Sequence, residues 1–482
     1  MSNSKLVRVA AAQYSVGSDI QQNLESALRV IATAEASKPR LLVLPEFINH
    51  LSWYDSPEHC YEVSLEPGGD FLKQLAQAAR AAGCYLVANC TMRREQGRCS
   101  GSSLMFSSDG ELLGVNDKQV LIGHENNFLE RARCAGPIID TPFARLGMYA
   151  CMDGVIFETP RYLALRGGQI LCNSVNSFAP DESSLHIPVR AAENKVFVVA
   201  ANKIGPLVPA ELLDDLSAVT NIPSQFLCGA GESQIVDPEG TVLAIASPDQ
   251  EEVVFADIDP TQADHKLRPD GSGLFHLRRP GLYSPIAQNP DTQPPAPAKT
   301  SGPVSVAMIP LPEPASAHLG PVAEQVAQAA SAGAELIVLP ELFCFDLRGE
   351  ISLDSCAEAE HAVQTLAAVC GNAYVAASFP WRDDRGQLIH AALLVNRDGV
   401  QCAQGQLHVG NRHAWAAAAD GINTLDLPFA HIGMVTGEDV IFPEVFRLLA
   451  IRGVDTVLAP YAAQEDWEVK TGLLERAAEN HI

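Results

Sequence analysis

Residues 145–167 read RLGMYACMDGVIFETPRYLALRG, and this stretch joins an apolar run to a helix-like run at Cys151. The apolar residues up to Ala150 predict a buried strand, and the residues after Cys151 predict the start of a helix. A thiol at such a turn lies near free backbone N–H groups, which stabilise a thiolate or an oxyanion. One cysteine among 12 is more often an inert buried residue, so a role for Cys151 needs support from elsewhere in the sequence.

The same pattern returns at residues 431–453, HIGMVTGEDVIFPEVFRLLAIRG, with Gly437 in the place of Cys151. No gap is needed over the whole stretch. Two other segments repeat, LLVLPEF at 41–47 as LIVLPELF at 336–343 and RAAEN at 190–194 as RAAEN at 476–480. Self-similarity on this scale indicates a tandem duplication of a whole domain.

Strand-like and helix-like runs alternate along both copies, which favours an α/β fold. A Pro-rich stretch separates the copies and predicts a semi-stiff linker at residues 284–302. We therefore expect one domain at residues 1–283 and a second at 303–482. The second copy has no counterpart of Phe197–Tyr283, so we expect it to be incomplete, whether the chain is a fragment or the domain is reduced.

Composition narrows the function classes. The 482 residues are 47% hydrophobic with a formal charge of −25, which is typical of a globular protein and argues against nucleic-acid or anionic-membrane partners. No apolar run reaches membrane-spanning length, and the first residues do not resemble a secretion signal. The cysteines show no metal-ligand spacing, so we expect reduced thiols in the cytoplasm.

Two further residues support a role for Cys151. Glu46 directly follows the apolar run LLVLP, at the end of a predicted strand, where catalytic groups of α/β folds collect. Lys118 precedes another apolar run, VLIG. Alone, each is most simply a surface charge. Together a glutamate, a lysine and a cysteine supply a base, an oxyanion stabiliser and a nucleophile for acyl transfer.

The order of these motifs resembles that of the nitrilase superfamily of carbon–nitrogen hydrolases. The resemblance covers residues 6–283 and rests on VLPE, DKQVL, YACMD, FETPR, RAAENKVFVVAANKIG, GESQIVDPEGTVLA and RRPGLY. It implies a four-layer αββα sandwich for each copy. It also implies that Glu46 deprotonates Cys151, that the thiolate attacks an amide-type carbonyl, and that Lys118 and the backbone N–H of Met152 bind the oxyanion. Ammonia or an amine leaves, and water releases the acid from the thioester.

Four more residues are candidates for the pocket. Glu125 matches the position of a substrate-positioning carboxylate in several amidase branches, although it is equally compatible with a surface glutamate. Trp53, Tyr54 and Phe128 are expected either to line the pocket or simply to pack. The residue after the nucleophile is Met152, where true nitrilases usually have tryptophan, and this favours an amide or N-carbamoyl substrate over a nitrile. The mechanism needs no metal or cofactor.

The second copy keeps Glu341 opposite Glu46 but places Gly405 at the lysine position and Gly437 at the cysteine position. No cysteine follows Cys402, so we expect a degenerate, non-catalytic domain. Such a copy can persist by pairing with the first as an intramolecular pseudo-dimer, with or without further homo-oligomerisation. The leading interpretation is a hydrolase of a small linear amide or N-carbamoyl compound. The alternatives are a nitrilase, an amide-dependent acyltransferase and a non-catalytic scaffold.

Overall fold

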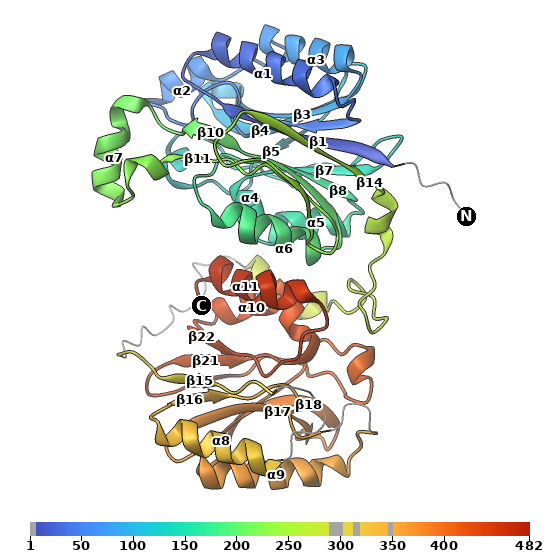
Figure 1. Cartoon of the computed structure of the whole chain (residues 1–482), viewed down its shortest axis with the longest axis vertical. Helices are drawn as coiled ribbons and strands as arrows, with labels where there is room; N and C mark the ends of the chain where they lie inside the picture. Colours follow the sequence, from blue (N-terminus) through green and yellow to red (C-terminus); the bar gives the residue numbers. More distant parts are fainter. Residues whose placement is uncertain (1–5, 289–301, 312–318, 346–349) are drawn as a thin grey trace. The chain divides into compact units, whose positions relative to one another are not determined.

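The computed structural model describes residues 6–288, 302–311, 319–345 and 350–482 (Figure 1). Contacts divide the chain into two compact units, Met1–Lys266 and Leu267–Ile482. Residues 267–283, which the sequence assigned to the first domain, belong to the second unit. Most of the predicted linker, residues 289–301, lies outside the described residues. None of the helices in the described ranges has both the length and the apolar character that a membrane crossing requires.

The first unit contains two sheets. The larger has eight strands in the order β11-β10-β1-β2-β3-β4-β5, with β14 pairing β1 on the same sheet. The smaller has six strands in the order β13-β12-β9-β8-β7-β6. The strands are β1 Val7–Ser15, β2 Leu41–Val43, β3 Tyr85–Arg93, β4 Cys99–Phe106, β5 Leu112–Asp117, β6 Ile139–Asp140, β7 Arg145–Ala150, β8 Ile170–Ser174, β9 Phe197–Ala201, β10 Lys203–Pro206, β11 Cys228–Ala230, β12 Gln234–Val236, β13 Val242–Ile245 and β14 Glu252–Ile258.

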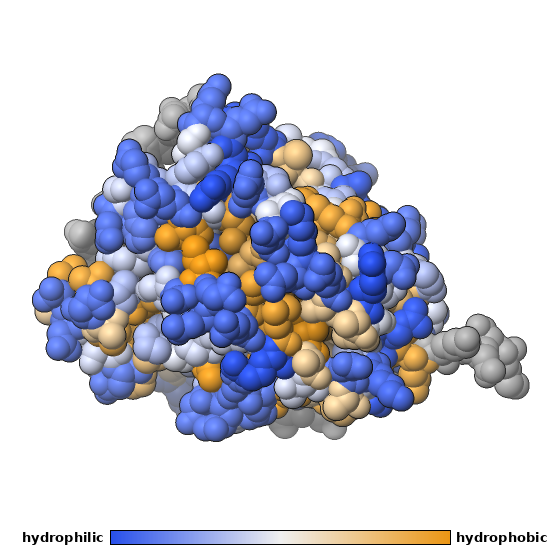
Figure 2. Space-filling model, turned by 90° about the horizontal axis from the view of Figure 1, so that it is seen from above, coloured by the Kyte–Doolittle hydropathy of each residue, from blue (hydrophilic) through white to orange (hydrophobic). Residues whose placement is uncertain are grey.

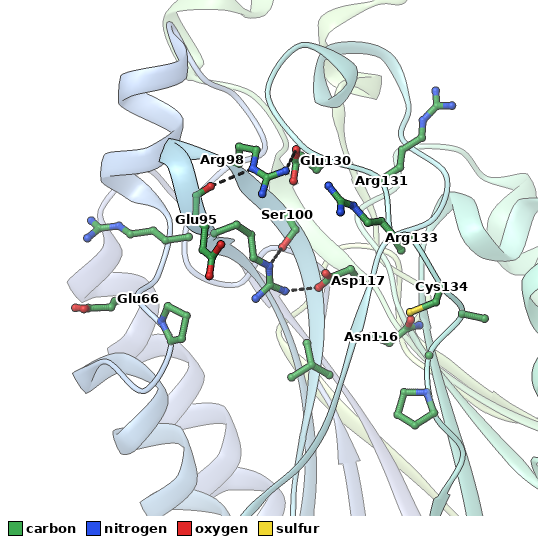
Figure 3. Close-up of a pocket in the computed structure, with 18 of the residues that line it drawn as sticks. Glu66, Glu95, Arg98, Ser100, Asn116, Asp117, Glu130, Arg131, Arg133 and Cys134 are labelled. Carbon is green, nitrogen blue, oxygen red and sulfur yellow. Dashed lines mark hydrogen bonds and ion pairs between the residues drawn. The ribbon is translucent and has the colours of Figure 1, made fainter.

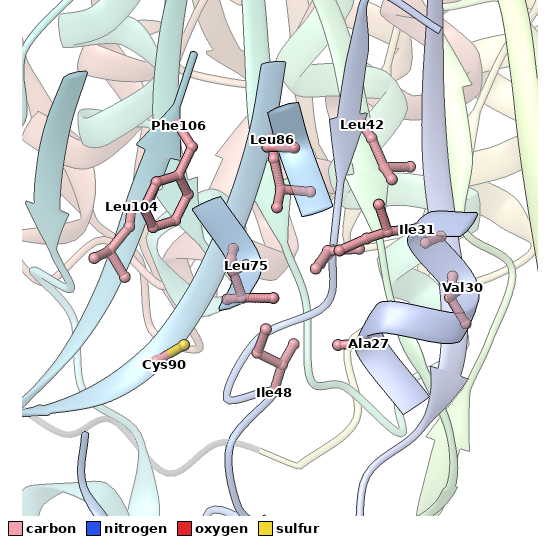
Figure 4. Close-up of a cluster of buried hydrophobic side chains, with 14 of the residues drawn as sticks. Ala27, Val30, Ile31, Leu42, Ile48, Leu75, Leu86, Cys90, Leu104 and Phe106 are labelled. Carbon is pink, nitrogen blue, oxygen red and sulfur yellow. The ribbon is translucent and has the colours of Figure 1, made fainter. Parts of the chain in front are cut away.

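Helices α1 Ile20–Glu35 and α3 Asp70–Ala82 cover the outer face of the larger sheet, and α4 Met152–Val155, α5 Glu158–Leu165 and α6 Ile187–Ala192 lie on the outer side of the smaller sheet (Figure 1). Two further helices, α2 Pro57–Val63 and α7 Leu213–Thr220, lie at one end of the sandwich (Figure 1). Apolar side chains of α1 and α3, including Ile31 and Leu75, pack on Leu42, Leu86 and Phe106 of the larger sheet (Figure 4). A separate buried cluster joins the facing surfaces of the two sheets. The layers are therefore helix, sheet, sheet and helix.

The first helix shows why these residues form this layer. Asp19 caps α1 by accepting hydrogen bonds from the backbone N–H groups of Gln21 and Gln22, at 2.9 and 3.0 Å. Leu24, Ala27 and Ile31 return at helical spacing and are buried. Hydrophilic side chains dominate the opposite, outward side, with apolar residues showing between them (Figure 2).

The second unit repeats the four layers with fewer strands. Its sheets follow the orders β15-β16-β17-β18-β19 and β20-β21-β22. The strands are β15 Val306–Met308, β16 Leu336–Val338, β17 Tyr374–Arg382, β18 Leu388–Asn396, β19 Gly399–Gly405, β20 Thr424–Asp426, β21 His431–Met434 and β22 Thr456–Leu458, and the helices are α8 Leu319–Ser331, α9 Ser355–Val369, α10 Pro443–Ala450 and α11 Leu473–Asn480. The prediction of two tandem αββα sandwiches is confirmed, and the described part of the second has the smaller sheets.

Residues 267–288 pack against the body of the second unit. The Arg268 guanidinium pairs with Glu465 and, at 2.6 Å, with Glu468, where both side chains are almost fully buried. Tyr283 Oη lies 2.6 Å from His408 Nε2. This segment, hereafter the strap, is held by buried ionic and hydrogen bonds, which explains why the unit boundary precedes it.

The repeated RAAEN motif makes the same contacts in both units. The Arg190 guanidinium lies 2.6 Å from the Glu193 carboxylate, and that of Arg476 lies 2.5 Å from Glu479. In each copy the asparagine side chain then donates to the arginine carbonyl at 2.9 Å. The identity of the two sequences here reflects an equivalent internal packing role.

Candidate active site

Glu46 and Lys118 meet in the interior of the first unit. Glu46 is the third residue after β2, and its backbone N–H donates to the carbonyl of Val175, after β8, at 3.1 Å. Lys118 directly follows β5. The Lys118 Nζ lies 2.8 Å from Glu46 Oε1, and both side chains are fully buried. An ion pair without solvent is costly to form and to break, so the two side chains hold each other in a defined geometry.

Glu125 is the second partner of this lysine. It lies in a short 3₁₀ segment, Gly123–Asn127, and its carboxylate is 2.9 Å from Lys118 Nζ. Both carboxylate oxygens lie at this distance from the lysine, and the backbone N–H of Ile122 also donates to Glu125 Oε2 at 3.2 Å. Lys118 therefore lies between two carboxylates, and the ionised trio carries one net negative charge. Glu125 is thus a buried member of the cluster and not a surface residue.

Cys151 stands at the turn between β7 and α4, as predicted. Its backbone has φ 48° and ψ −108°, a conformation that residues other than glycine adopt only at a cost in free energy. Its N–H donates to the carbonyl of Ser174 at 2.9 Å and to Asn173 Oδ1 at 3.0 Å. Met152 opens α4, and the N–H groups of a first helical turn have no acceptor within the helix. A strained residue held by two hydrogen bonds is typical of a functional turn.

Burial and charge set the protonation of these groups. Desolvation raises the pKa of Glu46 to about 7, even though Lys118 opposes the shift. Desolvation alone would lower the pKa of Lys118, but the carboxylates of Glu46 and Glu125 raise it overall. Desolvation, followed by the charge of Glu46, raises the pKa of the Cys151 thiol. The resting site therefore has a neutral thiol, a charged lysine and a glutamate that can take up a proton near neutral pH.

Asp153 positions the loop after Lys118. Its buried carboxylate accepts hydrogen bonds from the backbone N–H groups of Gln119 and Val120, at 3.0 and 2.8 Å. This contact ties the lysine-bearing segment to the turn that carries Cys151. Asp439 makes the same pair of bonds to Leu407 and His408, both at 2.8 Å. Its presence in both copies identifies Asp153 as part of the scaffold.

Lys203 is a further buried lysine, close enough to interact electrostatically with Glu46 and Cys151, that the sequence motifs did not single out. It opens β10, its side chain is fully buried, and its Nζ has no hydrogen-bond partner among the described residues. Desolvation lowers its pKa to about 7, while the charges of Glu46 and Cys151 act in the opposite sense. The sequence does hold a sign of this role, because Lys203 comes two residues after the end of the apolar run FVVAA. A lysine so close to a buried strand is a candidate for a buried, functional charge.

The predicted aromatic residues gather around the Glu125 segment. The Trp53 ring stacks on His124 with centroids 4.3 Å apart, and Phe128 lies 4.8 Å from the same ring. Tyr54 is buried and packs edge-on against Phe128 at 5.5 Å. These contacts brace the segment that carries Glu125. A role in lining the substrate pocket stays a prediction.

A wide pocket of about 890 Å³ lies beside β4 and β5. It is rich in arginine, including Arg98, Arg131 and Arg133 (Figure 3). Arg98 is paired with Glu130 at 2.8 Å. Glu46, Lys118 and Cys151 are absent from its lining, so this pocket is separate from the chemistry described above.

The second unit requires one correction to the alignment. The Lys118 N–H donates to Gly101, and the equivalent bond runs from Gln406 N–H to His390, at 2.8 and 2.7 Å. Gln406, and not Gly405, therefore occupies the lysine position. The shared glutamine of KQVLIG and GQLHVG suggested a register that is wrong by one residue. Gly437 does match Cys151, since both have positive φ, 56° and 48°.

A four-layer αββα unit with a buried glutamate, lysine and cysteine at these strand ends is typical of nitrilase-like proteins. The family model of carbon-nitrogen hydrolases matches residues 8–265 and again residues 305–482. The chain belongs to this family, and both copies are recognised as members.

Curated relatives match over about half of this chain. A nitrilase of Pyrococcus abyssi is 28% identical over 54% of this chain and 93% of its own length. An omega-amidase of Bos taurus is 27% identical, covering 52% and 88%. An N-carbamoylputrescine amidase of Solanum lycopersicum is 23% identical, covering 58% and 94%. Among solved structures, an amidase from Nesterenkonia sp. is 20% identical, covers 59% and 98%, and has a TM-score of 0.47.

Proposed function

We propose that the first unit hydrolyses the C–N bond of a small linear amide or N-carbamoyl compound through a thioester on Cys151. The observation that carries this proposal is the buried ion pair of Glu46 and Lys118, whose two charges act in opposite senses on the pKa of the Cys151 thiol. A carboxylate whose pKa is about 7 suits a general base, because it exists in both protonation states near neutral pH.

In the first half-reaction, Glu46 takes the proton of the Cys151 thiol as the sulfur attacks the carbonyl carbon. The carbonyl oxygen becomes an oxyanion, opposite the Nζ of Lys118 and the N–H of Met152. Protonated Glu46 then gives its proton to the leaving nitrogen, the C–N bond breaks, and ammonia or an amine departs. The acyl group stays on sulfur as a thioester.

In the second half-reaction, Glu46 takes a proton from water, and the hydroxide attacks the thioester carbon. A second oxyanion forms at the same place and collapses, the C–S bond breaks, and the thiolate recovers a proton from Glu46. The acid leaves and the site returns to its starting state. Splitting the hydrolysis in this way replaces one difficult step with two easier ones.

The nucleophile turn and the relatives support this class of substrate. Met152 replaces the tryptophan usual in nitrilases, which favours an amide over a nitrile. Omega-amidase and N-carbamoylputrescine amidase are among the named relatives, and both names describe cleavage of an amide-type bond. An uncharged planar C(=O)–N group also suits a buried site, because a charged substrate group would be costly to desolvate there.

The test is ammonia release from a panel of aliphatic amides, ω-amides, N-carbamoyl amines and nitriles with the full chain. We expect hydrolysis of at least one amide or carbamoyl substrate, and loss of several orders of magnitude in rate with Cys151→Ala. Cys134→Ala is the matched control, because this thiol is exposed and lines the separate arginine-rich pocket. Wild-type turnover by Cys151→Ala would exclude the thioester route. Nitrile hydrolysis alone, or acyl transfer to an amine in preference to water, would favour the alternative chemistries.

A further inference from the structure

The second unit gathers a different set of buried side chains at the position of the first unit's site. Glu341 takes the place of Glu46, and Gln406 that of Lys118. By the same alignment, His413 corresponds to Glu125 and Glu438 to Met152. His390 corresponds to Gly101. The side chains of Glu341, His390 and His413 are between 0 and 2% exposed. The second copy has thus exchanged one polar cluster for another, and has not simply filled the site with apolar residues.

Three atoms of this cluster converge. The Nε2 atoms of His390 and His413 lie 3.8 and 3.5 Å from Glu341 Oε1, and these ligand atoms all lie within 4.8 Å of one another. The spacings exceed a good hydrogen bond, about 2.7–3.2 Å. They approach the separation of about 3.3 Å that tetrahedral bonds of about 2.0–2.1 Å impose on neighbouring zinc ligands.

The ring nitrogens that point away from Glu341 are already committed. His390 Nδ1 lies 2.8 Å from Gln406 Oε1, and the Gln406 amide nitrogen donates to the carbonyl of His408 at 2.7 Å. The orientation of that amide makes His390 Nδ1 the donor. His413 Nδ1 lies 3.1 Å from the Glu438 carboxylate, which can only accept when ionised. In the neutral form, both rings therefore carry a lone pair on Nε2.

The lone pairs of both rings face an oxygen that has lone pairs of its own. Glu341 Oε1 has no hydrogen-bond partner among the described residues. Glu341 Oε2 is satisfied by the Ala462 N–H at 3.1 Å and the Arg412 guanidinium at 3.0 Å. The nearby Thr436 hydroxyl, 3.4 Å from His390 Nε2, donates its hydrogen to the Pro460 carbonyl instead. A cation between the three atoms, or added protons on the rings, would relieve this repulsion.

We propose that Glu341, His390 and His413 bind a divalent first-row transition metal ion, for which zinc is the probe. Two imidazoles and one carboxylate are ligands that zinc accepts. Gln406 and Glu438 orient the two rings through Nδ1, in the manner of the outer partners of metal-binding histidines. Arg412 compensates one of the charges of Glu341 and Glu438, and one negative charge remains to attract the ion. The proposal is independent of the chemistry proposed for the first unit.

The experiment uses the full chain, stripped with a chelator and titrated with Zn²⁺ by calorimetry. Metal content is measured after gel filtration. We expect one equivalent of zinc on the wild type, and binding at least 100-fold weaker with Glu341→Gln and with the double variant His390→Gln/His413→Gln. Glu46→Gln is the matched control, since it makes the same change in the other copy, and it should bind as the wild type does. Gln406→Leu removes only an orienting group and should weaken binding 10- to 100-fold.

Two readouts separate this site from a thiol site and from misfolding. Co²⁺ should give visible d–d bands without the intense near-ultraviolet transition of a cobalt–thiolate bond. Zn²⁺ should raise the melting temperature of the wild type but not that of Glu341→Gln, with matching circular dichroism spectra. Equal zinc content in the wild type and the double histidine variant overturns the proposal. So does a thiolate signal, or a wild type that binds no zinc, which would leave protonated histidines as the explanation.

Discussion

In the first unit, the residue after the VLPE glutamate is Phe47, and its ring lies 2.9 Å from where a Cβ on Gly101 would stand. In the second unit the equivalent residue is Leu342, with the same positive φ, and His390 takes the place of Gly101. Both backbones are held alike, by Asn89 in one copy and by Ser378 in the other. A smaller side chain at one position has made room for a larger one at the other. The fold therefore keeps its strand-end geometry while the side chains that meet there change.

Equivalent glutamate substitutions in the two copies should have very different effects on turnover. Glu46→Gln removes the base from both half-reactions, and we expect kcat to fall by about 10² to 10⁴. Glu341→Gln should change turnover less than twofold, because the residues around it include neither a thiol nor a lysine within the described part of the cluster. Steady-state rates on the best substrate of the panel measure both. Equal losses would mean that the second copy takes part in the reaction.

Lys118→Met tests the charge at the oxyanion position. The methionine keeps the length of the side chain but removes the ammonium group between Glu46 and Glu125. We expect a loss of about 3 kcal/mol of transition-state stabilisation, or 10² to 10³ in kcat. The counterpart Gln406→Met should leave the rate unchanged. A Lys118→Met enzyme within tenfold of the wild type would assign the lysine a packing role only.

The pH profile tests the state of the base. Glu46 must be ionised to accept the thiol proton, and its pKa is about 7, so kcat/KM should fall as the pH drops through that value. The positive charge of Lys203 lowers the pKa of Glu46, so Lys203→Met should raise it and move the acid limb to higher pH. Profiles of the wild type and both variants Lys203→Met and Glu341→Gln provide the measurement. An acid limb that does not move with Lys203→Met would show that this lysine is not coupled to the base.

The smallest expected effect concerns stability at the nucleophile turn. Cys151 and Gly437 share a positive φ, which favours glycine. Cys151→Gly should therefore stabilise the first unit by up to about 1 kcal/mol while abolishing turnover. Gly437→Ala should cost about 1–3 kcal/mol in the second unit, since the new Cβ would lie 2.5 Å from the Gln406 amide. Denaturant unfolding followed by tryptophan fluorescence checks both, and a stabilising Gly437→Ala would contradict the strain argument.

The sequence was a good guide wherever a residue follows directly from a buried strand. Glu46 and Cys151 were predicted at strand ends, and the structure has them there. The sequence could not show that Gln406 corresponds to Lys118. Aligning the glutamines of the two motifs shifts the register by one residue, and only the backbone hydrogen bonds reveal the correct one. Lys203 and His390 were missed for another reason. Lys203 lies on β10 and His390 on β18, away in sequence from the motifs that hold the other site residues. Their burial is what marks them as unusual polar residues, and the sequence alone does not show which side chains are buried.

The strap has a consequence for how the protein is made. Arg268 leaves the ribosome 197 residues before its partner Glu465, and this buried ion pair cannot form until that carboxylate has been synthesised. At about 5–20 residues per second, this delay lasts roughly 10 to 40 seconds. During this interval the nascent chain carries a basic segment of Arg268, Arg278 and Arg279 with no folded surface to receive it. Synonymous codons that slow translation across residues 303–465 should therefore lower the yield of folded protein more than the same codons placed within residues 1–266.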